Sequence, residues 1–131
     1  MLEGKKTILL VEDEKSLTEA VKTKLEILGF DVVSARSVDQ AVSYLEDIKN
    51  IDLVWLDHYL LGKENGLDLV IKMKAEDSKW KKIPIFIISN TASPDKINSY
   101  LHLGVEKYFT KADNRLDNII KDINSVLSKD T

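Results

Sequence analysis

The sequence predicts an α/β domain in which five parallel strands alternate with five helices, and three observations support this fold class. Short apolar runs with the length and β-branched composition of buried strands occur five times along the chain. Segments with apolar residues at helical spacing separate these runs, and the connections between the two kinds of segment are short. This alternation favours a parallel sheet with right-handed crossovers and helices on both faces.

The expected strands cover residues 7–11, 30–35, 51–57, 83–89 and 107–110. The third is the clearest, because residues 51–57 form an almost unbroken apolar run that ends in the carboxylate of Asp57. Pro84 stands near the start of the fourth strand, where the loss of a backbone donor is tolerated. Each strand leads into a more polar segment, as expected where a chain leaves a buried sheet.

Caps and apolar stripes mark the expected helices. Gly29 stands where the first helix needs a left-handed C-cap. Ser37 and Gln40 have the spacing of a capping box at the start of the second helix. The third helix follows a glycine-containing loop, and the fourth begins at a serine–proline pair. Asp113 or Asn114 caps the fifth, whose apolar residues over 116–127 form one stripe.

Length and composition limit the class of protein. A chain of 131 residues is the size of one domain, and its net charge of −3 argues against a general nucleic-acid binder. No apolar segment approaches the roughly 20 residues that a membrane helix needs, and the absence of cysteine excludes disulfides and thiolate sites. We therefore expect one cytoplasmic domain over residues 1–131, with its core over 6–128, that binds neither nucleic acid nor a membrane.

Polar residues collect at the carboxyl ends of the expected strands, where open parallel sheets bind their ligands. Glu12 and Asp13 follow the first strand, and Asp57 ends the third. Ser89 ends the fourth strand, and Lys111 follows the fifth. Because these loops emerge at one edge of the sheet, we expect the five side chains to meet. Crowded carboxylates repel one another, so a proton, the lysine ammonium or a cation must compensate their charge.

This set of groups suits a hard cation and phosphoryl chemistry. Oxygen ligands that leave room for waters and a phosphate oxygen suit Mg²⁺ better than Ca²⁺. A carboxylate beside a metal, a lysine and a hydroxyl is able to attack a phosphoryl donor, because the cations neutralise the transferring oxygens. Taken singly, the acids fit a helix N-terminus and the lysine a solvated surface. Their coincidence favours a metal-binding acidic cluster on a flavodoxin-like sheet.

Five segments also occur in an order and spacing typical of one family: LLVEDE at 9–14, DLVWLD at 52–57, GLDL at 66–69, IPIFIIS at 83–89 and GVEKYFTK at 104–111. Over essentially its whole length the sequence resembles the receiver domain of bacterial two-component response regulators. The resemblance implies a flavodoxin-like (βα)5 fold with strand order 2-1-3-4-5. It also implies a signalling phospho-acceptor with Mg²⁺-dependent self-phosphorylation and autodephosphorylation, and not a conventional enzyme.

The resemblance assigns roles to the acidic residues. Asp57 would accept a phosphoryl group from a phosphohistidine on a sensor histidine kinase or a histidine phosphotransfer protein. Asp13 would bind Mg²⁺ directly, Glu12 mostly through water, and Asp57 with the backbone carbonyl of Tyr59 would complete the protein ligands. Mn²⁺ is the expected substitute ion.

It also implies a conformational switch. Ser89 would bond the phosphoryl group, Lys111 would pair with it, and Tyr108 would turn inward when Ser89 moves. The fourth helix, fifth strand and fifth helix, about residues 93–127, would then present the output face to a downstream protein target or to a second copy in a homodimer. A local charge change would thereby bias a two-state element.

The sequence departs from the family pattern at several positions. Ala112 follows Lys111 where the family usually has proline, so this bond is either cis, at a cost of about 3 kcal/mol, or trans with a rebuilt loop. Asn90 replaces a usual small residue, and Leu61 a usual proline. The loop from there to Gly66 is one residue longer than is common. These differences concern rates and loop geometry, because every reactive group is present.

Alternatives remain open at this point. Because no output domain follows Thr131, the leading interpretation is a stand-alone receiver, and the alternative is a receiver excised from a larger regulator or hybrid kinase. A small phosphatase would place an acid where Tyr59 stands, and a flavin site would not place three acids at 12–14. We expect His58 to be a loop residue at the rim of the site, and Tyr100 to face either the core or a partner.

Overall fold

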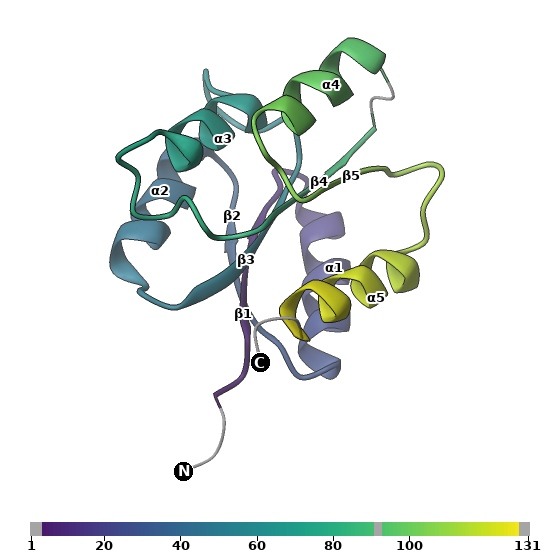
Figure 1. The fold of residues 1–131 in the computed structure, drawn as a ribbon. Helices are drawn as coiled ribbons and strands as arrows, with labels where there is room; N and C mark the ends of the chain where they lie inside the picture. Colours follow the sequence, from purple (N-terminus) through teal and green to yellow (C-terminus); the bar gives the residue numbers. More distant parts are fainter. Residues whose placement is uncertain (1–3, 91–92, 129–131) are drawn as a thin grey trace.

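Five parallel strands form one sheet between helices in the computed structural model, which describes residues 4–90 and 93–128 (Figure 1). The strands are β1 (Thr7–Val11), β2 (Asp31–Ala35), β3 (Ile51–Leu56), β4 (Ile85–Ser89) and β5 (Lys107–Thr110). The helices are α1 (Lys15–Ile27), α2 (Val38–Asp47), α3 (Gly66–Lys74), α4 (Pro94–His102) and α5 (Leu116–Ser128). The strand order is β2-β1-β3-β4-β5 and every pairing is parallel. The predicted fold class and strand order are confirmed.

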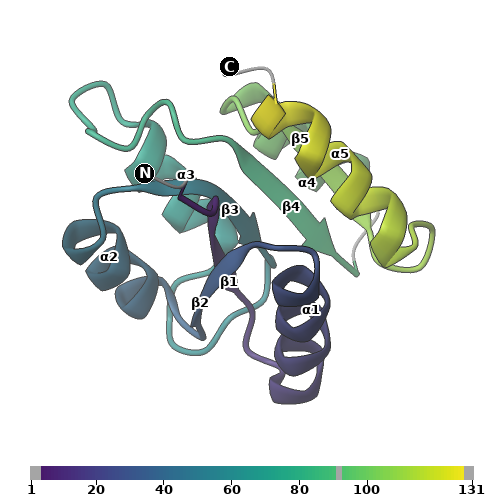
Figure 2. The ribbon, with the colours of Figure 1, turned by 90° about the horizontal axis from the view of Figure 1, so that it is seen from below.

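Each face of the sheet carries its own apolar core. Along β1, Ile8 and Leu10 belong to one core and Leu9 and Val11 to the other, because side chains alternate across a strand. Helices α1 and α5 cover the first core, and α2, α3 and α4 cover the second (Figure 2). The sheet is therefore buried on both sides, which is why its strands read as continuous apolar runs.

One polar residue interrupts the apolar run of β3 for a structural reason. Thr7 pairs with Ile51 and Ile8 with Leu53, so Asp52 is an extra residue in β3. Its carboxylate accepts a hydrogen bond from the Thr7 backbone N–H at 2.8 Å. Beyond this bulge the side chains of β3 alternate between the two faces of the sheet. Asp52 lies near the start of β3, whereas Asp57 directly follows its end.

Three local predictions need correction. Strand β4 begins at Ile85, two residues later than expected, although the Pro84 carbonyl still accepts from Val54 N–H at 3.0 Å. Ser37 caps α2 through the Gln40 N–H at 3.2 Å, but the Gln40 side chain accepts from the backbone N–H before Ser37, at 2.8 Å, so the reciprocal half of the capping box was wrong. Asp113 and Asn114 do not cap α5. Their side chains bond to Thr110 and close the preceding turn.

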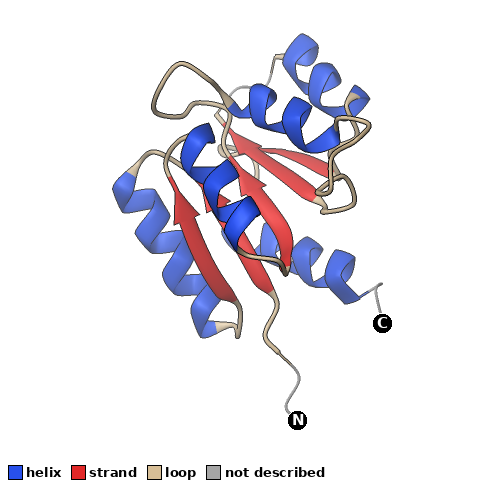
Figure 3. Ribbon diagram, turned by 90° about the vertical axis from the view of Figure 1, so that its left-hand side faces the viewer, coloured by secondary structure: helices blue, strands red, loops and turns tan. Residues whose placement is uncertain are grey.

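The βα loops all leave the sheet at the edge toward which the strand arrows point (Figure 3). Gly29 (φ 98°) ends α1 in the left-handed conformation, as predicted. Asn65 begins α3 with a capping box in which its side chain accepts from the Asp68 N–H and Asp68 accepts from the Asn65 N–H. None of the helices in the described part of the chain is both long and apolar enough to span a membrane.

Candidate functional site

Backbone pairing at the edge of the sheet places the first two acids. The Glu12 N–H donates to the Ala35 carbonyl at 2.9 Å, and the Asp57 N–H donates to the Val11 carbonyl at the same distance. Each bond extends the ladder by one residue beyond the strand. Glu12 and Asp57 are therefore buried at the carboxyl edge, next to one another on adjacent strands.

Asp13 completes an acidic cluster with these two residues. Glu12, Asp13 and Asp57 each offer a carboxylate oxygen, and these three oxygens lie within 4.8 Å of one another. Asp13 is half-buried, whereas its two neighbours are buried. The structure therefore brings together the three acids that the sequence placed at strand ends.

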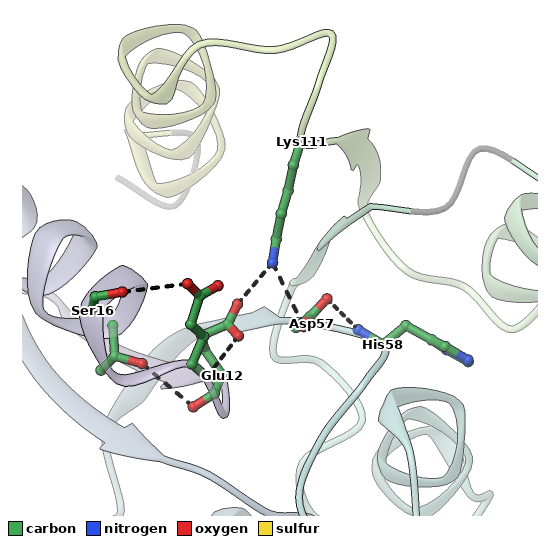
Figure 4. A network of polar contacts seen from close by, with 7 residues as sticks. Glu12, Ser16, Asp57, His58 and Lys111 are labelled. Carbon is green, nitrogen blue, oxygen red and sulfur yellow. Dashed lines mark hydrogen bonds and ion pairs between the residues drawn. The ribbon is translucent and has the colours of Figure 1, made fainter.

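Lys111 supplies the positive charge inside the cluster. From the loop after β5 its side chain reaches between Glu12 and Asp57 (Figure 4). Its Nζ lies 3.0 Å from Glu12 Oε1 and 3.6 Å from Asp57 Oδ2. The lysine is itself largely buried, with 19% of its side chain exposed. Because water screens this ion pair less than a pair at the surface, its charges attract each other more strongly.

The environment of Asp57 raises the pKa of its carboxyl group. Burial and the nearby Glu12 raise the pKa of Asp57 to about 6, although Lys111 and the His58 backbone N–H act in the opposite direction. That N–H donates to Asp57 Oδ1 at 2.8 Å, which leaves Oδ2 as the oxygen that lies toward Lys111. One ammonium therefore does not fully compensate the acids around this carboxylate.

The donor set fits a hard divalent cation. Three carboxylates and one ammonium leave an excess of negative charge, and closely spaced oxygens are the ligands that Mg²⁺ takes in proteins. Glu12 already accepts from Lys111 through Oε1 and from the Glu14 N–H through Oε2, at 3.1 Å. Direct binding of an ion by Asp13 and Asp57 stays a prediction. The carbonyl of Tyr59 as a further ligand stays a prediction.

Ser89 and Tyr108 lie on neighbouring strands and contact one another. Ser89 is buried at the end of β4, and the Lys111 N–H donates to its carbonyl at 2.8 Å. Burial raises the pKa of Tyr108, while a hydrogen bond between its side chain and that of Ser89 lowers it. Tyr108 is half-buried and its ring packs against that of Tyr100, with centroids 5.8 Å apart. The two residues predicted to act as a switch are thus in direct contact.

The structure decides the open question at Ala112. No cis peptide bond occurs among the described residues, so the Lys111–Ala112 bond is trans. The chain turns here through the hydrogen bonds of Asp113 and Asn114 with Thr110. A rebuilt loop, and not a strained bond, therefore carries Lys111.

His58 lies in the loop after β3, as expected, but its expected place at the rim of the site was wrong. The imidazole is buried, with 5% of the residue exposed, and it does not line the rim of the site. Its ring points away from the Asp57 carboxylate (Figure 4), and Nδ1 lies 2.5 Å from the hydroxyl oxygen of Tyr100, which is also buried. Tyr100 therefore faces the core and not a partner.

Arg36 is a residue that sequence reasoning missed. Its guanidinium donates to the Asp13 carbonyl from two nitrogens, at 3.1 and 3.4 Å, while its own carbonyl accepts from the Leu61 N–H at 3.0 Å. It therefore holds the loop of the acidic cluster and the loop after Asp57 together. The available signal was its position directly after β2, at the same sheet edge as the other site residues.

Comparisons with known proteins match this chain over most of its length. A family model described as the response regulator receiver domain matches residues 8–124. The chemotaxis protein CheY1 of Helicobacter pylori is 32% identical over 106 residues, which cover 79% of this chain and 83% of CheY1. The phosphate regulon transcriptional regulatory protein PhoB of Pseudomonas aeruginosa is 33% identical over 106 residues, covering 81% of this chain and 45% of PhoB.

Solved structures extend the similarity to the fold. A response regulator receiver protein from Pseudomonas putida superimposes with a TM-score of 0.86 at 26% identity, over 95% of this chain and 99% of that one. The chain spans less than half the length of PhoB.

Proposed function

The chain belongs to the response regulator receiver family of two-component signalling, and on this premise we propose that Asp57 accepts a phosphoryl group from a phosphohistidine donor. One observation supports the proposal above all others. The Asp57 carboxylate lies at the carboxyl edge of the sheet between two further acids and a buried ammonium, within reach of all three. We further propose that residues 1–131 act as one receiver unit.

The two oxygens of the Asp57 carboxylate have different roles in the proposed transfer step. The His58 N–H holds Oδ1, and Oδ2 attacks phosphorus. An O–P bond forms as the N–P bond to the donor imidazole breaks, and that imidazole leaves with the electron pair and takes up a proton. Lys111, 3.6 Å from Oδ2, then pairs with the phosphoryl oxygens. Mg²⁺, or Mn²⁺ in its place, held by Asp13, Asp57, the Tyr59 carbonyl and, through water, Glu12, would neutralise further charge on the same oxygens.

We propose that Ser89 and Tyr108 report the reaction to the output face. The Ser89 hydroxyl, which bonds Tyr108, would turn to the phosphoryl group, and the tyrosine ring would settle in the space beside β4. The face formed by α4, β5 and α5 then differs between the two states and engages a downstream protein or a second copy. Partners at the site itself are a sensor histidine kinase or a phosphotransfer protein.

The test is phosphorylation by acetyl phosphate with and without Mg²⁺, followed by intact-mass measurement. We expect a Mg²⁺-dependent gain of one phosphoryl group that Asp57→Asn abolishes. Asp52→Asn is the matched control, because Asp52 lies in the same strand at its other end and an amide oxygen still accepts from Thr7. Wild-type protein that gains no phosphoryl group from acetyl phosphate or a phosphorylated kinase would instead be a phosphorylation-independent receiver.

A further inference from the structure

A buried hydrogen bond connects the residue after Asp57 to helix α4. His58 Nδ1 and the Tyr100 hydroxyl oxygen are 2.5 Å apart, and the two rings meet edge to face with centroids 5.7 Å apart. The residues are 42 positions apart in the sequence, and Tyr100 has no exposed surface. The contact therefore joins the loop after β3 to α4 inside the protein, where water does not replace a lost partner.

Helix α4 contacts two consecutive residues of this loop. Lys96 stands one helical turn before Tyr100, so both side chains lie on the same face of α4. Lys96 Nζ lies 5.3 Å from the centroid of the Tyr59 ring and 3.4 Å from its hydroxyl. One face of α4 thus holds His58 from inside the protein and Tyr59 from outside.

Gly66 makes room for this contact. Its N–H donates to the His58 carbonyl at 2.8 Å. A Cβ at this position would lie 2.6 Å from the Asp57 carbonyl oxygen, 2.8 Å from the Tyr100 hydroxyl and 3.1 Å from His58 Cα. Only glycine allows the start of α3, the acceptor loop and Tyr100 to approach so closely. The contact is therefore built into the packing of three segments.

His58 connects this hydrogen bond with Tyr100 to the carboxylate of Asp57. The His58 N–H donates to Asp57 Oδ1 at 2.8 Å, and the His58 ring shares a hydrogen bond with the Tyr100 hydroxyl. The Tyr100 ring in turn packs on Tyr108 at 5.8 Å. Burial lowers the pKa of His58 and raises that of Tyr100.

We propose that His58 and Tyr100 are positioning residues that form a second connection from Asp57 to α4, beside the one through Ser89 and Tyr108. Phosphorylation of Asp57 would change the hydrogen bond that its carboxylate accepts from the His58 N–H. Because the His58 ring is tied to Tyr100, a displacement of this backbone moves α4. This inference rests on the proposed phosphorylation of Asp57. It assigns a role in the switch to two residues outside the reactive set.

The experiment measures hydrogen–deuterium exchange over residues 94–102 with and without beryllofluoride and Mg²⁺, a stable mimic of the phosphoryl group. Tyr100→Phe removes only the hydroxyl, and His58→Leu removes the imidazole. The double variant removes both hydrogen-bonding groups, so neither is left buried without its partner. It replaces a single variant that folds poorly. Tyr44→Phe is the matched control, because Tyr44 is a half-buried tyrosine packed on the same core in α2.

We expect the beryllofluoride-induced change in α4 exchange to fall at least two-fold in each single variant and no further in the double variant. Tyr44→Phe should keep the wild-type response. A role in packing alone would alter exchange equally with and without beryllofluoride, so the difference between the two states isolates coupling.

Two negative outcomes are distinct. A full α4 response in Tyr100→Phe and His58→Leu, with beryllofluoride bound, overturns the connection and leaves the proposed function intact. Wild-type protein that binds no beryllofluoride and gains no phosphoryl group overturns the proposed function and this inference with it.

Discussion

At the scale of single residues, Asp57 combines a buried position with a charge that the site does not fully compensate. Burial and Glu12 raise its pKa from 3.8 to about 6. The native state therefore binds more protons than the unfolded chain between about pH 4 and pH 6. The ionised carboxylate then lowers stability as the pH rises through this window. The stability of the surrounding fold must offset the cost of keeping this carboxylate buried.

Replacement of Asp57 by asparagine should stabilise the protein in the absence of metal. The shift from 3.8 to about 6 corresponds to roughly 3 kcal/mol, so we expect Asp57→Asn to gain on the order of 1–3 kcal/mol at pH 7.5. The gain should vanish below about pH 3, where the wild-type carboxyl is protonated in both states. Urea unfolding with a chelator at both pH values measures it. Equal stability of the two proteins at pH 7.5 would contradict the electrostatic account.

Lys111 is the residue that makes the metal-free cluster tolerable. Lys111→Met leaves the buried carboxylates of Glu12 and Asp57 without their cation, which should cost on the order of 2 kcal/mol at pH 7.5. Lys107→Met is the matched control, because Lys107 pairs with Asp122 in a more exposed contact and should change stability by less than about 1 kcal/mol. Denaturant unfolding compares the two. Similar losses would show that position in the cluster does not matter.

At the scale of elements, the start of α3 is packed against the end of β3. Asn65 and Asp68 cap the helix reciprocally, and Gly66 then approaches the Asp57 carbonyl more closely than any side chain would allow. The capping box and the glycine thus set where the loop after Asp57 ends. Earlier in this loop, Leu61 pairs with Ser37 in an isolated parallel bridge.

A methyl group at residue 66 should therefore disturb the site itself. We expect Gly66→Ala to cost about 2 kcal/mol or more, because rigid backbone must move to admit the Cβ. Gly104→Ala is the comparison, since its Cβ meets only the end of the Lys74 side chain, at 4.0 Å, and the cost of about 1 kcal/mol comes from its positive φ. Thermal unfolding ranks the variants, and acetyl-phosphate uptake should fall only in Gly66→Ala. A larger loss for Gly104→Ala would contradict the packing argument.

At the scale of the whole molecule, binding of a metal at the acidic cluster would stabilise the fold as a whole. The acids of this cluster directly follow β1 and β3, and its lysine comes from the loop after β5, so the site connects the middle of the sheet to one of its edge strands. A ligand that binds only this assembled site stabilises the entire fold by mass action.

Mg²⁺ should accordingly raise the unfolding temperature, with a shift that grows with the logarithm of its concentration. At 100 times the Kd the stabilisation is about 2.7 kcal/mol. Asp13→Asn should remove most of this shift. Glu14→Gln should retain it, because Glu14 is exposed and its side chain accepts from Ser16 Oγ outside the cluster. Differential scanning calorimetry with chelator and with Mg²⁺ provides the measurement. The metal assignment fails if both variants respond like the wild type.

The sequence by itself determined the order of the elements, the two-sided sheet and the edge at which the acids gather. These features depend on local periodicity and on one rule of parallel sheets, that all βα loops emerge on the same side. Glu12, Asp13, Asp57 and Lys111 could be placed together for that reason, and the structure confirms their proximity. Their chemical roles stay predictions.

Only the tertiary structure decided which groups touch one another. The pairing of His58 with Tyr100, the contact of Ser89 with Tyr108 and the trans bond after Lys111 depend on packing between distant segments. Tyr100 is the one buried residue of the nine in α4, and the core that this helix meets sets the direction of its side chain. Contacts of this kind are a property of the assembled sheet and its helices and are not encoded in any local stretch.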